Sequence, residues 1–70
     1  MRVVVIKKEP IELYMILKLE NMVASGGEAK FVIAEGLVLV NGEIETRKRK
    51  KIVAGDIIEF NNEKMQISCK

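Results

Sequence analysis

The chain has 70 residues, of which 49% are apolar and only 4% aromatic, and it contains one cysteine and no histidine. A chain of this length forms one domain, here residues 1–70, with an aliphatic core. The lack of histidine excludes the usual zinc sites and the Ser-His and Cys-His nucleophile pairs, and no phosphate-binding loop is present, so we predict a protein that is not an enzyme and has no metal or cofactor.

The charged residues are unevenly distributed along the chain. There are 12 Lys and Arg residues against 10 Asp and Glu residues, a net charge of +2. Five of the cations are consecutive, and we call them the basic pentad: Arg47, Lys48, Arg49, Lys50 and Lys51. Without the pentad, seven basic residues face ten acidic ones, so the remainder has a net charge of −3. The pentad is therefore a positive pole on an acidic body, which suits a polyanionic partner.

The cysteine count and the hydropathy pattern bear on location. Cys69 is the only cysteine, so no internal disulfide can form, as is usual in a reducing compartment. The apolar run at 3–6 is too short for a signal-peptide core or for the roughly 20 residues of a membrane span. We expect a cytoplasmic protein with no membrane and no small-molecule partner.

The first half of the chain begins with a predicted strand over residues 1–6, which is rich in β-branched side chains. Pro10 is suited to the first position of a helix, so we predict that it opens a helix over residues 11–19. Its apolar residues recur at helical spacing on one face: Leu13, Ile16 and Leu17, with Met15 and Leu19 widening the stripe.

A second helix is predicted over residues 26–35. The preceding sequence Ser25-Gly26-Gly27-Glu28 is a capping box, in which the serine and glutamate side chains bind main-chain N–H groups at the helix start. Gly36 is a natural stop. The apolar residues of this helix again share one face: Ala29, Val32 and Ile33.

The second half of the chain alternates short apolar runs with turn residues. Asn41-Gly42 predicts a tight hairpin between strands at 37–40 and 43–46. Further strands are expected at 57–60 and 63–69. The fold class is therefore α+β, a helical hairpin packed on a small, mainly antiparallel sheet of four to five short strands.

The pentad does not fit a regular strand. Alternation would place Lys48 and Lys50 on the same face as Ile44 and Ile52, both expected in the core, and two buried lysines are very unfavourable. The pentad is therefore predicted to be an exposed arm or the tip of a hairpin.

The segment 25–42 resembles the S4-type RNA-binding domain, also called the alpha-L motif, and is most similar to its small stand-alone bacterial members. The shared positions are Ser25, Ala29, Ile33, Gly36, Val38, Val40, Asn41 and Gly42, followed by Val53, Gly55, Asp56 and Ile58. The resemblance covers residues 11–60. It implies an L-shaped concave surface that binds RNA, with ribosomal or transfer RNA as the target and ribosomal particles as further partners. Gly26 stands where the family often has arginine.

The expected RNA-binding residues come from the pentad and from the second helix. Arginines can fork onto phosphate oxygens and lysines act as point charges. The helix start leaves N–H groups open to a phosphate. With few aromatic residues for base stacking, structured RNA is a better target than single strands. Besides the pentad, the expected contacts are Ser25, Gly26, Gly27 and Lys30.

Two other functions remain open from the residues. A protein-interaction adaptor could dock on an acidic or ribosomal partner through the pentad. A DNA-binding module is a weaker alternative, because the second helix contains Glu28 and Glu35 but a single cation, Lys30.

Overall fold

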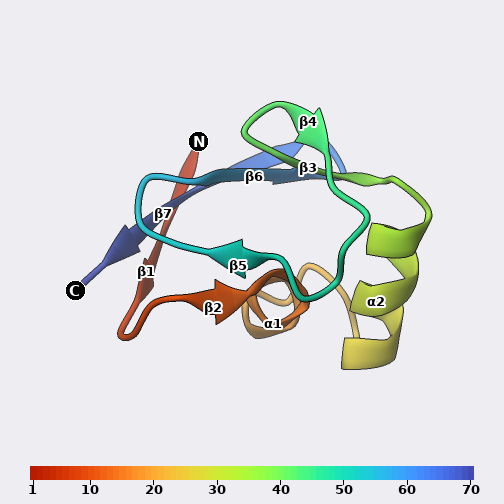
Figure 1. Ribbon diagram of the computed structural model, residues 1–70, viewed down its shortest axis with the longest axis horizontal. Helices are drawn as coiled ribbons and strands as arrows, with labels where there is room; N and C mark the ends of the chain where they lie inside the picture. The colour runs from red at the N-terminus through yellow and green to blue at the C-terminus, as the bar shows by residue number, and fades with distance from the viewer.

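The computed structural model describes all residues, 1–70, and contains two helices and seven short strands (Figure 1). In chain order these are β1 (Arg2–Ile6), β2 (Ile11–Glu12), α1 (Leu13–Leu19), α2 (Gly26–Ala34), β3 (Val38–Val40), β4 (Glu43–Ile44), β5 (Lys51–Ile52), β6 (Ile57–Phe60) and β7 (Glu63–Cys69). Neither helix is long and apolar enough to cross a membrane.

The strands form two sheets. The larger has five strands in the order β1-β7-β6-β3-β4, and all neighbours are antiparallel except β1 and β7, which are parallel. The smaller consists of β2 and β5 alone. In the view of Figure 1 both helices lie below β3 and β6, and the segment that joins β4 to β5 runs down to the start of α1. The predicted α+β class with a mainly antiparallel sheet is confirmed.

The core is entirely apolar. It contains 15 buried residues, and no polar or charged residue is among them. The predicted inner faces of both helices are confirmed, since Leu13, Ile16 and Leu17 of α1 and Ala29, Val32 and Ile33 of α2 are all buried. Burial of each large aliphatic side chain contributes about 1.5–3 kcal/mol. Leu19, expected to extend the stripe, is instead 59% exposed.

The first helix begins later than predicted. Ile11 and Glu12 are extended and pair with Ile52 and Lys51 as the small second sheet, so Pro10 precedes a strand and does not open the helix. Pairing with a strand some 40 residues further along the chain overrides the local preference of proline, and α1 starts at Leu13.

The capping box of α2 is present. The Glu28 main-chain N–H donates to Ser25 Oγ at 3.1 Å, and Glu28 Oε1 accepts from the Ala24 N–H at 2.6 Å. The glutamate therefore reaches one residue further back than expected. Gly36, with φ of +77°, follows the end of the helix as predicted.

The Asn-Gly and Gly-Asp motifs meet in space and stabilise the sheet. Asn41 has a positive φ, as the hairpin requires, and its side chain donates to Asp56 Oδ1 at 3.1 Å and accepts from the Ile57 N–H at 2.9 Å. The other Asp56 oxygen accepts from the Val53 N–H at 3.0 Å. These two residues therefore hold the β3–β4 turn against the β5–β6 turn.

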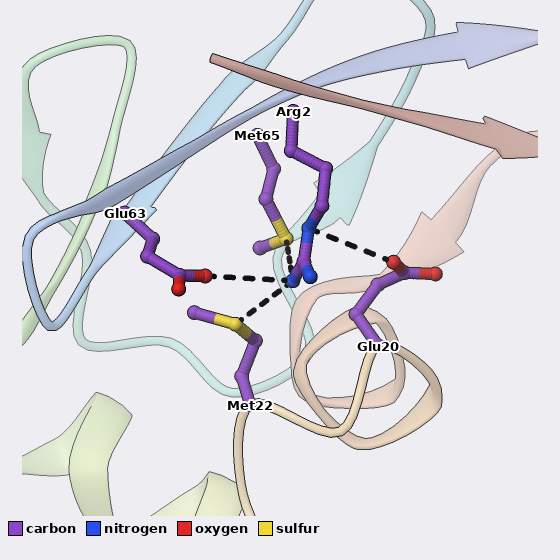
Figure 2. A network of polar contacts seen from close by, with 5 residues as sticks. All are labelled: Arg2, Glu20, Met22, Glu63 and Met65. Atoms are coloured by element: carbon purple, nitrogen blue, oxygen red, sulfur yellow. Dashed lines mark hydrogen bonds and ion pairs between the residues drawn. The ribbon is translucent and has the colours of Figure 1, made fainter.

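Arg2 connects the edge strand β1 to the connection between the helices (Figure 2). Its guanidinium donates to Met22 Sδ at 3.0 Å and to Met65 Sδ at 3.5 Å, with Glu20 and Glu63 at 3.9 and 3.7 Å. Arg2 is thus occupied within the fold, and none of these contacts involves the pentad.

Candidate nucleic-acid interface

The pentad is exposed and leaves the regular strand geometry, as predicted, but it is neither an arm nor a hairpin tip. Its main chain is bound to the start of α1: the Tyr14 N–H donates to the Lys48 carbonyl at 3.1 Å and the Leu13 N–H to the Lys50 carbonyl at 2.9 Å. The N-cap residue Glu12 provides no side-chain cap. The pentad carbonyls therefore satisfy N–H groups that the helix leaves without a partner.

Of the two core positions that the prediction assumed, Ile52 is buried, whereas Ile44 is 65% exposed. The segment departs from strand geometry as a turn, since the Lys50 N–H donates to the Arg47 carbonyl at 3.1 Å. The carbonyls of Lys48 and Lys50 can thus bind α1 without burying the lysines. All pentad side chains are exposed except Lys50, which is half-buried.

The pentad and the end of α2 line an open hollow of about 790 Å³. One wall includes Ala34, the last residue of α2, and the rest consists of Thr46 and all five pentad residues. No acidic and no aromatic side chain lines it. The hollow is therefore a concave surface with cations along one side.

Arg47 differs from the other four cations because an acid holds it. Its Nε donates to Glu45 Oε2 at 2.9 Å and its Nη2 to Glu45 Oε1 at 3.1 Å. The hydrogen bonds from Arg47 lower the pKa of Glu45 from its ordinary value of 4.5 to about 2, and Glu45 in turn raises the pKa of Arg47. The only other ion pairs of the structure involve Arg2, so Lys48, Arg49, Lys50 and Lys51 form none.

Lys30 of α2 is related to the pentad through Tyr14. Its Nζ is 5.0 Å from the centroid of the Tyr14 ring, and the main chain of Tyr14 binds Lys48. A cation over an aromatic ring is attracted by about 0.5–1 kcal/mol at an exposed site. The structure therefore brings Lys30 and the pentad together through Tyr14.

Ser25, Gly26 and Gly27 lie at the opposite end of α2 from Ala34. Gly26 packs beside Lys18, since a Cβ placed on this glycine would be 4.0 Å from Lys18 Cδ. No hydrogen bond or ion pair joins the helix start to the pentad. Gly26, Lys30 and Ala34 are nevertheless spaced by four and share one side of α2, which runs from the helix start to the hollow.

Two charged residues of this surface are absent from the sequence-based site. Lys18 packs beside Gly26. Its spacing of four residues from Tyr14 indicates that the two side chains lie on the same face of α1, so the sequence could have identified it. No sequence pattern identified Glu45, because an acidic residue beside a basic run is ordinarily expected to be exposed to solvent.

The fold and this basic concave surface define a small α+β domain of the nucleic-acid-binding kind. A family model described as the S4 domain matches residues 4–68, and the chain belongs to this family. The chain is 49% identical over 61 residues to the Escherichia coli (strain K12) protein named "Putative RNA-binding protein YbcJ", a match that covers 87% of each chain. It is 42% identical over 55 residues to the Bacillus subtilis (strain 168) protein named "Probable ribosome maturation protein RlbA", covering 79% of this chain and 78% of the other.

The solution structure of YbcJ from E. coli confirms the architecture. It superposes with a TM-score of 0.73 at 46% identity, covers 97% of this chain and 87% of its own, and is described as revealing an alpha-L motif involved in RNA-binding. The predicted membership of the S4 family and the predicted alpha-L fold are therefore confirmed.

Proposed function

We propose that this protein is a non-catalytic RNA-binding protein that recognises structured RNA through its backbone phosphates. The observation on which the proposal depends is the basic pentad, whose main chain is fixed to α1 while its side chains line an open hollow. The names of its relatives, an RNA-binding protein and a ribosome maturation protein, support RNA as the ligand and favour ribosomal over transfer RNA.

The arrangement of the pentad suits a folded polyanion. Four consecutive cations without ion pairs lie along a turn and the start of β5, where hydrogen bonds hold the main chain in place, so little ordering is needed when phosphates arrive. Each phosphate contact releases counterions from the RNA, which favours binding at low salt. Because no aromatic residue lines the hollow, stacking on unpaired bases is not available there.

The α2 side of the surface extends the proposed contact area. Lys30 provides a further cation on α2. The main-chain N–H groups of Ser25, Gly26 and Gly27 lie at the start of this helix, the end that its dipole makes positive. An RNA that reaches both ends of α2 would touch Lys18 as well.

The test is a comparison of ligands across a salt series. Fluorescence anisotropy would follow binding to a labelled RNA hairpin, to a single-stranded RNA of the same composition and to a DNA duplex. We expect the tightest binding to the hairpin and a linear fall of log affinity with log salt. Equal affinity for all three ligands would reduce the protein to a general polyanion binder. No binding to any of them, with retention of an acidic protein partner, would support the adaptor function instead.

A further inference from the structure

Glu45 is an acidic residue placed against the basic pentad and anchored to the larger sheet. It directly follows β4, and its N–H donates to the Val38 carbonyl of β3 at 2.9 Å. Its side chain is only 13% exposed, whereas that of its partner Arg47 is 71% exposed. The carboxylate is therefore the fixed member of the pair and the guanidinium the accessible one.

Three hydrogen bonds join Arg47 to this carboxylate. Besides the two from the guanidinium, the Arg47 main-chain N–H donates to Glu45 Oε2 at 3.0 Å. A guanidinium has five N–H groups in a fixed plane, and Glu45 uses only the edge formed by Nε and Nη2. The edge formed by Nη1 and Nη2 remains able to fork onto a second anion, and Arg47 lines the hollow.

From this geometry we propose that Glu45 is a positioning residue for RNA binding. It holds the guanidinium of Arg47 so that the remaining edge is presented to a phosphate in the hollow. The inference rests on the proposed function. It assigns to an acidic residue a favourable part in binding a polyanion, which charge alone does not predict.

Simple electrostatics and positioning predict opposite results for removal of this carboxylate. Glu45→Gln changes the net charge from +2 to +3. If the pentad acted only as a positive field, the variant would bind RNA more tightly. If Glu45 positions Arg47, the variant loses charge-assisted hydrogen bonds to the guanidinium and binds more weakly.

The experiment compares Glu45→Gln with Glu43→Gln, using a fluorescein-labelled RNA hairpin as the probe. Glu43 lies two residues away on β4, is exposed and forms no ion pair, so its variant has the same charge change without touching Arg47. We expect Glu45→Gln to weaken binding roughly tenfold, the effect of losing one charge-assisted hydrogen bond. Glu43→Gln should leave affinity unchanged or slightly raise it.

A second variant tests the same geometry from the side of the arginine. Arg47→Lys keeps the charge but cannot offer two planar edges at once. Arg47→Lys should weaken hairpin binding to a similar degree. The double variant with Glu45→Gln should show little further loss, because both changes disrupt the same hydrogen-bonded Glu45–Arg47 pair. Amide NMR spectra of each variant check that the fold is intact.

The outcomes separate this inference from the proposed function. Binding by Glu45→Gln that equals or exceeds that of Glu43→Gln, with wild-type protein still binding the hairpin, would overturn the positioning role alone. An Arg47→Lys variant with wild-type affinity would overturn it as well. Wild-type protein that binds no RNA would overturn the proposed function and the positioning role with it.

Discussion

The molecule has two runs of exposed cations, and they differ in what surrounds them. The pentad is hydrogen-bonded through its carbonyls to α1 and lines the basic hollow. Lys7 and Lys8 follow β1 in a bend and lie beside an apolar groove of about 340 Å³ between β1 and α1. Neither lysine forms an ion pair.

This difference shows that a count of charges does not identify a phosphate-binding surface. A pair of lysines at a strand end is a common way of protecting a sheet edge, and β1 is such an edge. The pentad instead has a fixed main chain, an acid that orients one arginine, and a second helix that adds Lys30. Fixed geometry distinguishes the binding surface from a solvated one.

The largest effect is expected for a buried residue of α1, the helix to which the pentad is hydrogen-bonded. Leu17 is fully buried in α1, so Leu17→Ala should lower the free energy of unfolding by about 2–5 kcal/mol. Leu19 is on the same helix but 59% exposed, and Leu19→Ala should change it by less than about 0.5 kcal/mol. Urea unfolding measures both. Similar effects at the two sites would mean that the face of α1 is assigned incorrectly.

The next effect separates the two cation runs directly. Changing Lys48, Arg49 and Lys51 together to Gln should leave the fold intact, because these side chains are exposed and unpaired. Each cation that no longer neutralises a phosphate should flatten the slope of log affinity against log salt by roughly 0.7–0.9. We therefore expect a large decrease in affinity for structured RNA and a markedly shallower slope.

The matched control changes Lys7, Lys8 and Lys64 to Gln, which removes the same charge from elsewhere on the surface. This variant should keep most of the affinity and most of the slope. If both triple variants weaken binding equally, the protein acts as a diffuse polycation and the surroundings of the pentad are irrelevant.

Much of the fold followed from periodicity and turn chemistry. The helix faces, the capping box at Ser25 and the Asn41-Gly42 hairpin are local patterns, and each is present in the structure. The late start of α1 was not predictable in this way, since it depends on the pairing of Ile11 with Ile52.

The sequence predicted which cations form the basic surface but not how the fold holds them in place. The five cations are evident in the sequence, whereas their attachment to α1 depends on main-chain groups that any residue possesses. The pairing of Glu45 with Arg47 depends on a turn that alternation did not predict. Side-chain identity therefore indicated which residues can bind a phosphate, and tertiary contacts determine how they are held.

A smaller effect is expected at the start of α2, which lacks hydrogen bonds to the pentad. Ser25→Ala removes the cap on the Glu28 N–H and should cost about 1 kcal/mol of stability. RNA affinity measured on the folded variant should change little. A variant of unchanged stability that no longer binds RNA would show that the hydroxyl contacts the ligand, and the helix start would then rank with the pentad.

The smallest effect concerns pH and the acid that distinguishes the pentad from the lysine pair. The pKa of Glu45 is lowered from 4.5 to about 2 in the folded protein by its hydrogen bonds from Arg47. A lowered folded-state pKa means that the contribution of Glu45 to stability is complete above pH 4.5 and is lost as the pH falls toward 2. Because Arg47 is well exposed, solvent screening keeps this contribution small. The measurement is the unfolding free energy of wild type minus that of Glu45→Gln, determined as a function of pH. This difference should be constant from neutral pH to about pH 5 and shrink below pH 4.5.

Lys7 and Lys8 have no acidic partner, so no corresponding acid-dependent difference is expected for a Lys7→Gln, Lys8→Gln variant. A difference that remains constant down to pH 2 would show that the carboxylate and the guanidinium do not interact in solution, and Arg47 would then be as free as its four neighbours.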